Sequence, residues 1–254
     1  MSTPKSSIPA IVLRYTDYAE ADRIVHLLTK EYGVISAMVR GARASKKKYS
    51  GLIDLGNLLD VTFSSTKGEI WTLQKASAQK SMLRTRGNLH KLAFLSYACE
   101  LISYAAQAGN PEPKLFGLLE NLLHILEEDD GRIGPRFRIA FELKLLTFAG
   151  YMPQLKQCMA CGGKITSDIS IFSTEGGVFH NYCLPQIDSP SKVIHSCSLL
   201  WLQEVYKALK SPMRTSLSVE MLAGPQWVFA QVFSQIYQKP IKAKSFLASL
   251  ETPL

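Results

Sequence analysis

The stretch IPAIVLRYTDYAEADRIVHLLTKEYGVISAMVRGA, residues 8–42, consists of short runs rich in Val, Ile, Leu, Thr and aromatic residues. Turn-forming residues such as Glu31-Tyr32-Gly33 separate the runs, which is the pattern of β-strands joined by tight turns. Two further runs of this kind follow at 57–66 and 69–79. Five strands in about 70 residues are too few for a sandwich and enough for a small Greek-key barrel of the oligonucleotide-binding (OB) type. We therefore predict an OB-type barrel that binds nucleic acid over residues 1–80.

Beyond residue 82 the apolar residues recur three and four positions apart, which is the period of helices rather than strands. We expect a bundle of several helices over residues 81–254, so that the chain is an α+β protein of two domains. The segments with this period are 89–107, 113–129, 134–150, 198–211 and 224–238. Pro and Gly interrupt the pattern at 110–111, 134–135, 150, 211–212 and 224–225.

Four residues with metal-binding side chains lie within the helical part, in two pairs. Each pair encloses two residues, and this spacing lets a tight turn direct both side chains at one tetrahedral ion. Glycines follow the first pair at 162–163 and precede the second at 176–177, where they supply the backbone conformations that such turns need. We therefore predict a zinc site. Its ligands are Cys158, Cys161, His180 and Cys183.

The predicted zinc ion is structural, because protein side chains fill all four positions and leave none for a catalytic water. One ion per chain would hold a small, loop-rich knuckle inserted between two helices at about residues 155–190. Phe172 and Phe179 are expected to pack beneath the metal. His195 and Cys197 lie nearby as competing ligands, and their one-residue spacing makes them poorer ones. The sequence leaves open whether either of them replaces His180.

The net charge of +8 is concentrated in the first third of the chain. Residues 1–86 contain 14 Lys and Arg against 7 Asp and Glu, whereas residues 87–254 contain 15 against 14. A basic domain attached to a nearly neutral remainder indicates a polyanionic partner, most simply a nucleic acid. An anionic membrane surface is the weaker alternative, because no amphipathic helix accompanies these charges.

The densest basic segment is RGARASKKKYSG at 40–51, directly after the third predicted strand. A charge run of this kind is often only a solvated loop. On an OB barrel its side chains can neutralise phosphates, which gives affinity for single- and double-stranded DNA irrespective of base sequence. Tyr15, Tyr18 and Trp71 are weaker candidates for stacking on bases, because aromatic residues of small barrels more often belong to the core. The candidate DNA-binding residues are Arg14, Arg23, Arg40, Arg43, Lys46, Lys47 and Lys48.

The chain lacks the common motifs of catalysis. It contains no Walker phosphate loop, no H-E-x-x-H, no G-x-S-x-G and no G-x-G-x-x-G after a strand. A zinc deaminase requires a glutamate two residues after its histidine ligand, whereas Tyr182 stands there after His180. We therefore expect a protein that is not an enzyme. Because no apolar run approaches the roughly 18 residues of a membrane span and no signal peptide is recognisable, we expect a cytoplasmic location without membrane association.

Four segments of the chain carry a resemblance to a known family. They are YTDYAEADRIVHLLTKEYGVISAMVRGAR at 15–43, FELKLLTFAGYMPQLKQCMACGG at 141–163, GGVFHNYC at 176–183 and YQKPIKAKSFLASL at 237–250. In this order, and along nearly the whole chain, they resemble the bacterial RecO family of recombination and repair mediators. The zinc-bearing members of that family use four cysteines, and His180 stands in the place of the third. Other members lack the site.

The resemblance implies an N-terminal OB barrel and a C-terminal helical domain with an inserted zinc knuckle. It also implies a function in DNA repair and homologous recombination by the RecF pathway, at the nucleoid. A protein of this family binds single- and double-stranded DNA and anneals complementary strands. It engages single-stranded-DNA-binding protein and RecR, and it helps RecA to load.

Two alternative functions come from other classes of protein. A zinc-containing transcriptional regulator needs a recognition helix with basic residues on one exposed face. The segment RFRIAFELKLL at 136–146 is the only basic helix start, and its apolar face predicts burial. A zinc-dependent nucleic-acid enzyme needs carboxylates that converge on a metal, and Asp54, Asp60 and Glu69 are scattered.

Overall fold

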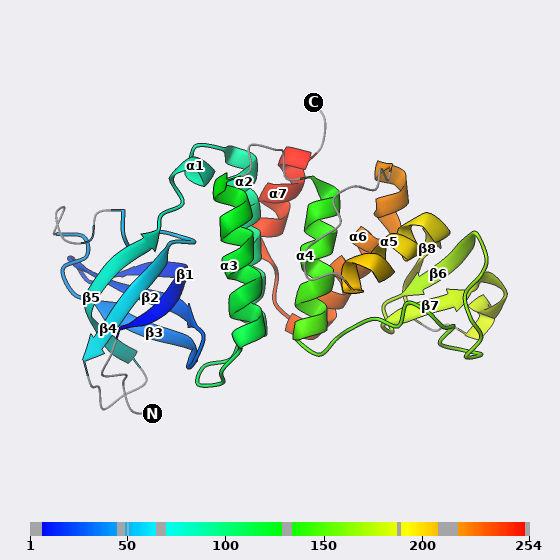
Figure 1. The fold of residues 1–254 in the computed structure, drawn as a ribbon, viewed down its shortest axis with the longest axis horizontal. Helices are drawn as coiled ribbons and strands as arrows, with labels where there is room; N and C mark the ends of the chain where they lie inside the picture. The colour runs from blue at the N-terminus through cyan, green and yellow to red at the C-terminus, as the bar shows by residue number, and fades with distance from the viewer. Residues whose placement is uncertain are drawn as a thin grey trace. The chain divides into compact units, whose positions relative to one another are not determined.

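The computed structural model describes residues 7–44, 49, 51–64, 70–128, 134–186, 189–207 and 218–251 (Figure 1). The chain forms two compact units, of which the first comprises residues 1–132 with 241–254 and the second residues 133–240. The predicted domain boundary between residues 80 and 81 stays a prediction. Among the described residues, no helix combines the length and the apolar character that crossing a membrane requires.

Five strands close a barrel in the first unit, in the order β1-β2-β3-β5-β4. Neighbouring strands are antiparallel except β3 and β5, which run parallel, and the pairing of β1 with β4 completes the closure. This is the Greek-key arrangement of an OB-type barrel, so the predicted fold of this part is confirmed. The strands are β1 Ile8–Tyr18, β2 Asp22–Thr29, β3 Gly33–Val39, β4 Leu58–Ser64 and β5 Ile70–Lys80.

Strand alternation fills the barrel interior with apolar side chains. Val12, Val25 and Leu27 belong to this core, and so does Trp71. The Trp71 ring makes edge contacts with Phe63 and Tyr32, at centroid distances of 5.1 and 5.5 Å. Trp71 is 5% exposed and therefore belongs to the core instead of offering a surface to bases.

The solvent exposure of the barrel's outer surface changes along the β1–β2 hairpin. Ile11 and Leu28 pair across the two strands and are fully buried, although they are not part of the interior core. Helix α2, Leu89–Ala105, contacts β1, and helix α3, Pro113–Glu128, contacts β2. The second half of β1, from Arg14 to Tyr18, is exposed. The helices thus cover one end of the hairpin and leave the other end to solvent.

Helices α2, α3 and α7 of the first unit lie side by side (Figure 1). The short helix α1, Leu83–Arg86, precedes α2, and α7 comprises Lys242–Glu251. Glu100 of α2 accepts hydrogen bonds from the backbone amides of Lys242 and Ala243 at 2.9 and 2.8 Å, which satisfies the unpaired amides at the start of α7. Cys99 is fully buried and burial raises its pKa to about 12, so it is a core residue.

Over its described residues, the second unit combines three α-helices with a small sheet. The helices are α4 Pro135–Phe148, α5 Ser196–Lys207 and α6 Val219–Tyr237. The sheet has the order β7-β6-β8, and its strands are β6 Ile169–Ser173, β7 Gly177–His180 and β8 Ser191–His195. A 3-10 helix, η1, covers Asn181–Gln186. The predicted loop-rich knuckle therefore contains regular strands, which are too short to show a clear alternation in the sequence.

Helix α6 contradicts one expectation from the sequence. Gly224 and Pro225 predict a break, whereas α6 begins at Val219 and continues through both residues. Pro225 has no amide to donate to the Met221 carbonyl, and the Ser198 hydroxyl donates to that carbonyl instead, at 2.7 Å. A Cβ at Gly224 would lie 2.2 Å from the Val193 carbonyl oxygen. Both residues therefore serve the close packing of α6 against α5 and β8.

Candidate nucleic-acid interface and metal centre

Arg14 lies on the exposed half of β1, opposite His26 of β2. Its Nη2 is 3.5 Å from His26 Nδ1, which is also 3.0 Å from the Ser36 hydroxyl. Burial of the His26 ring and the positive charge of Arg14 lower the pKa of His26. The ring is therefore neutral at neutral pH, and Arg14 carries the positive charge at this position.

Asp17 forms ion pairs with two of the predicted arginines at the solvent-exposed end of the β1–β2 hairpin. Arg23 donates to Asp17 Oδ1 at 2.8 Å, and Arg43 Nε lies 3.6 Å from Oδ2. The hydrogen bond from Arg23 and the charge of Arg43 lower the pKa of Asp17, although burial opposes this. Arg43 also donates from its amide to the Ala21 carbonyl at 2.9 Å, so the start of the basic segment is fixed to the hairpin.

Arg40 is exposed and follows Val39, the residue that pairs with Arg23. The guanidinium of Arg23 lies 4.4 Å above the Tyr15 ring, and Tyr15 and Tyr18 are 41% and 52% exposed. Three predicted arginines and two exposed tyrosines thus belong to the β1–β2 hairpin and the end of β3. The other predicted residues of the basic segment, Lys46, Lys47 and Lys48, lie outside the described residues.

The four predicted metal ligands converge in the second unit. The ligating atoms of Cys158, Cys161, His180 and Cys183 all lie within 4.8 Å of one another. In the described part of the chain, no other group of three or more His, Cys, Asp and Glu side chains is arranged in this way. The competing ligands His195 and Cys197 are not members of the group.

A backbone carbonyl orients the histidine of this cluster. His180 Nε2 lies 3.2 Å from the Lys164 carbonyl oxygen, which only accepts, so Nε2 carries the ring proton. Nδ1 then carries no proton, so its lone pair is available to a metal ion, and it lies 3.3 Å from Cys161 Sγ. A second hydrogen bond of this kind is the usual device that fixes the tautomer of a metal-binding histidine.

The first cysteine pair lies in a tight turn. The Gly162 amide donates to the Cys158 carbonyl at 2.9 Å, and Gly162 has a positive φ of 70°. A Cβ at Gly163 would lie 3.3 Å from His180 Cε1 and 3.4 Å from Cys161 Sγ. Glycine at both positions therefore permits the turn and the close approach of the ligands, as the sequence predicts.

The environment of the thiols favours a bound cation. Burial opposes ionisation of Cys158, but hydrogen bonds from the backbone amides of Cys161, His180 and Ala160 outweigh it and lower the pKa of Cys158 to about 6. Burial, followed by interactions with the other two thiols, raises the pKa of Cys183 to about 11. A cation at the centre removes the repulsion between thiolates.

The donor set fits a tetrahedral metal ion. Three thiols and one imidazole match the ligands of closed structural sites. Zn–S bonds of about 2.3 Å place tetrahedral sulfurs about 3.8 Å apart, within the spread of the cluster. Phe179 packs against Cys158 and Cys183, as expected for a residue beneath the metal. The expectation for Phe172 is wrong, because its ring packs edge-on against Phe229 of α6 at 5.7 Å.

Several residues of these sites were not identified from the sequence. Asp17 is one of them. The sequence did contain a signal for it, because a hairpin with a short turn places Asp17 directly opposite Arg23. The Lys164 carbonyl and Tyr182, whose ring stacks on His180 at 4.7 Å, had no signal. The apolar face of α4 predicted that this helix would be buried despite its basic start, and Arg138 and Glu142 are both buried.

Comparison with known proteins covers almost the whole chain. The family model described as recombination protein O N terminal matches residues 1–82, and the model described as recombination protein O C terminal matches residues 86–195. A DNA repair protein RecO from Syntrophotalea carbinolica is 30% identical over 96% of this chain and 94% of its own length. The RecO proteins of Myxococcus xanthus and Dehalococcoides mccartyi are 30% and 32% identical over 95% of this chain, and over 96% and 94% of their own lengths. This chain therefore belongs to the RecO family of DNA repair proteins.

Proposed function

We propose that this chain is a recombination mediator that binds single- and double-stranded DNA through its barrel and anneals complementary strands. The observation that carries this proposal is the exposed basic end of the β1–β2 hairpin. Arg14, Arg40 and Arg43 lie there on an OB-type barrel whose opposite end is covered by helices. Family membership supports the same reading.

Annealing follows from contacts to the phosphates rather than to the bases. Cationic side chains that neutralise phosphates reduce the repulsion between two strands, and contacts of this kind do not read base sequence. Asp17 holds Arg23 and Arg43 at the hairpin end, so these guanidinium groups are positioned in advance. Tyr18, and the face of Tyr15 that Arg23 does not cover, offer surfaces on which an unpaired base stacks without regard to sequence.

The proposal extends to the partners that the family resemblance implies. With RecR, the protein helps to load RecA onto DNA that is coated by single-stranded-DNA-binding protein. It works at the nucleoid in the cytoplasm and is not an enzyme. The basis for these partners is the family resemblance alone.

We also propose that the metal is zinc, one ion per chain, held by Cys158, Cys161, His180 and Cys183. The ion supplies a covalent-like cross-link between the two halves of the knuckle and activates no water, because protein side chains occupy all four positions. The soft thiol donors and the closeness of the four ligating atoms support zinc.

An annealing assay tests the proposed function. The full-length, metal-loaded protein is mixed with two complementary oligonucleotides, with and without single-stranded-DNA-binding protein and RecR. We expect duplex to form faster than without the protein, and also on coated strands when RecR is present. No acceleration on bare strands would contradict annealing. Loss of full-length DNA that depends on a divalent ion would favour the nucleic-acid enzyme instead.

A further inference from the structure

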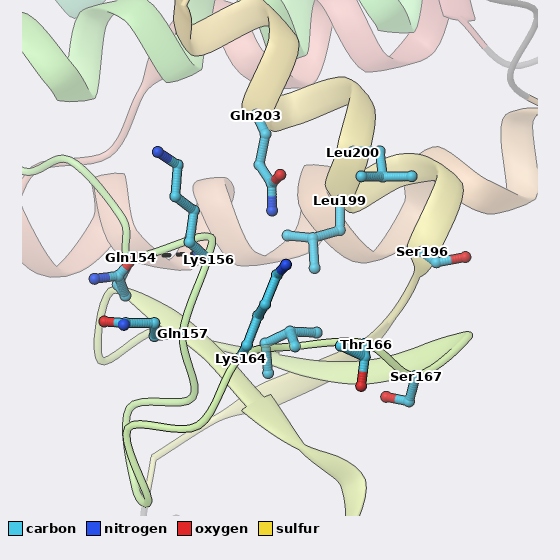
Figure 2. Close-up of a pocket in the computed structure, with 11 residues that line it drawn as sticks. Gln154, Lys156, Gln157, Lys164, Thr166, Ser167, Ser196, Leu199, Leu200 and Gln203 are labelled. Carbon is cyan, nitrogen blue, oxygen red and sulfur yellow. Dashed lines mark hydrogen bonds between the residues drawn. The ribbon is translucent and has the colours of Figure 1, made fainter.

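A cavity of about 620 Å³ lies in the second unit, between the metal-binding knuckle and helix α5. This volume is within the range of pockets that hold small ligands. Figure 2 shows Lys164 reaching into the cavity from the knuckle towards Leu199 and Gln203 of α5. Neither the barrel nor the metal cluster contributes a residue to the lining.

The lining has one cationic, one amide and one apolar part. Lys156 and Lys164 bring two ammonium groups, and no carboxylate lines the cavity. Within the described ranges, no carboxylate lies within 4.0 Å of either ammonium group. The apolar wall consists of Ile165, Leu199 and Leu200. A ligand that fills this cavity is therefore anionic at one end and apolar elsewhere.

The glutamines of the lining offer both kinds of hydrogen-bonding atom. Gln203 donates through Nε2 to the Leu155 carbonyl at 2.6 Å, so its Oε1 remains as an acceptor for a ligand. The Oε1 of Gln154 accepts from the Lys156 amide at 3.1 Å, so its amino group remains as a donor. The edge of a nucleobase presents donors and acceptors side by side. The carboxylates of an acidic peptide only accept, so they can bind the lysines but cannot donate to the Gln203 oxygen, whereas a base edge offers donors as well.

We infer that this cavity binds one nucleotide of a DNA strand, with its phosphate on Lys156 and Lys164 and its base between the apolar wall and the glutamine amides. The inference rests on the proposed DNA-binding function and adds a strand contact in the second unit. Apolar side chains hold the faces of an extruded base, and the amides hold its edge.

The metal centre supports one wall of this cavity. The carbonyl of Lys164 accepts from the ligand His180 at 3.2 Å, and the Ile165 amide donates to the Lys156 carbonyl at 3.3 Å. Gln157 forms a β-bridge with Lys164 directly beside the first cysteine pair. The knuckle thus holds both lysines in place, and loss of the metal ion would release this wall. An ion bound at the cluster would thereby support the cavity wall without contacting the bound nucleotide.

A titration with a single nucleotide tests binding to the cavity separately from the binding of a strand to the barrel surface. The full chain, metal-loaded and labelled with ¹⁵N, is titrated with 2′-deoxyadenosine 5′-monophosphate while amide spectra are recorded. We expect the largest shifts at the side-chain amide of Gln203 and at the backbone amides of Lys164 and Thr166. Inorganic phosphate and an acidic peptide of equal charge serve as competitors and should act more weakly. No shift at these amides, or tighter binding of the peptide, would overturn the inference.

Charge-removing variants connect the cavity to strand binding. Lys156→Ala combined with Lys164→Ala removes exposed side chains and keeps the Lys164 carbonyl, so the metal content should not change. The slope of log affinity for oligothymidylate against log salt should shrink by about 0.7, since the two lysines share one phosphate and each neutralised phosphate contributes about 0.7 to the slope. Lys192→Ala, an exposed lysine of the same unit outside the cavity, is the control.

The outcomes separate this inference from the proposed function. If the double variant binds strands like the wild type while variants of the barrel surface lose affinity, the cavity inference is wrong and barrel binding stands. If neither set of variants changes strand affinity, both are wrong. If the double variant alone loses affinity, the cavity is a strand contact and the barrel surface is not.

Discussion

Replacing His180 by alanine removes one of the four proposed metal ligands and distinguishes the proposed site from the competing ligands His195 and Cys197. His180 belongs to the cluster whose ligating atoms lie within 4.8 Å of one another, and His195 and Cys197 do not. We therefore expect His180→Ala to lose the bound ion, whereas His195→Ala retains about one zinc per chain. His180→Cys, which replaces the imidazole by a thiol, should retain the ion as well.

The stability effect follows from the cluster that would surround the ion. It contains Cys158, Cys183, Ile171 and Phe179, so only two of its buried members are not proposed ligands. The knuckle also buries Leu155, Phe172 and Val178, so apolar packing and the proposed ion would stabilise it together. Free zinc at a thousand times its Kd stabilises by about 4 kcal/mol, which corresponds to roughly 15–30 °C in Tm for about 100 residues.

The assay combines metal analysis with thermal unfolding in a reducing buffer free of chelator. The wild type, His180→Ala and His195→Ala are compared at the same free zinc concentration. A His180→Ala chain that retains about one zinc and the wild-type Tm would refute the assignment of this ligand. Loss of zinc from His195→Ala alone would identify His195 as the fourth ligand.

Three further changes test the first unit. Trp71→Ala should lower the free energy of unfolding in denaturant by about 3–5 kcal/mol, because the ring fills the barrel core; an unchanged midpoint would contradict that placement. The pKa of His26 lies below its ordinary 6.5, so as the pH drops below about 6.5 the unfolded chain takes up this proton first and the folded state loses stability. His26→Gln should reduce this loss of stability between pH 7 and 5. An unchanged pH profile of stability would show that other groups cause the loss. Glu100→Gln weakens the acceptor of two amides at the start of α7 and should cost about 1–2 kcal/mol, seen as faster hydrogen exchange in α7.

The barrel strands were predictable from the sequence, because alternation and turn residues act locally. Residues 8–42 form strands β1, β2 and β3 as predicted, and the bounds of β4 and β5 differ by one or two residues from the predicted runs at 57–66 and 69–79. The start of helix α6 was not predictable, because the helix continues through Pro225 with the help of a hydroxyl of α5 that is distant in sequence. Strands β6, β7 and β8 contain only 4–5 residues each and show no clear period.

The cluster of four metal-binding side chains was predictable, because the spacing is local within each pair and the turn glycines accompany it. The orientation of His180 was not, since it depends on a backbone carbonyl with no signature in the sequence. The role of Asp17 depends on hairpin register, which the turn length implies. The cavity is built from segments between residues 154 and 203 that only the folded chain brings together.

The salt dependence of strand binding is the decisive measurement for the barrel surface. Affinity for oligothymidylate is measured across salt concentrations for the wild type and for the combined alanine variant of Arg43, Lys46, Lys47 and Lys48. The control replaces four lysines elsewhere in the first unit, Lys30, Lys114, Lys242 and Lys244.

We predict that the basic-segment variant loses affinity for all strand sequences alike. Its log–log salt slope should shrink by up to about 0.7 for each phosphate that is no longer neutralised, about 2.8 in total. Annealing should slow in parallel, while the control variant keeps the wild-type slope. Wild-type affinity, slope and annealing rate in the basic-segment variant would contradict DNA binding through this surface.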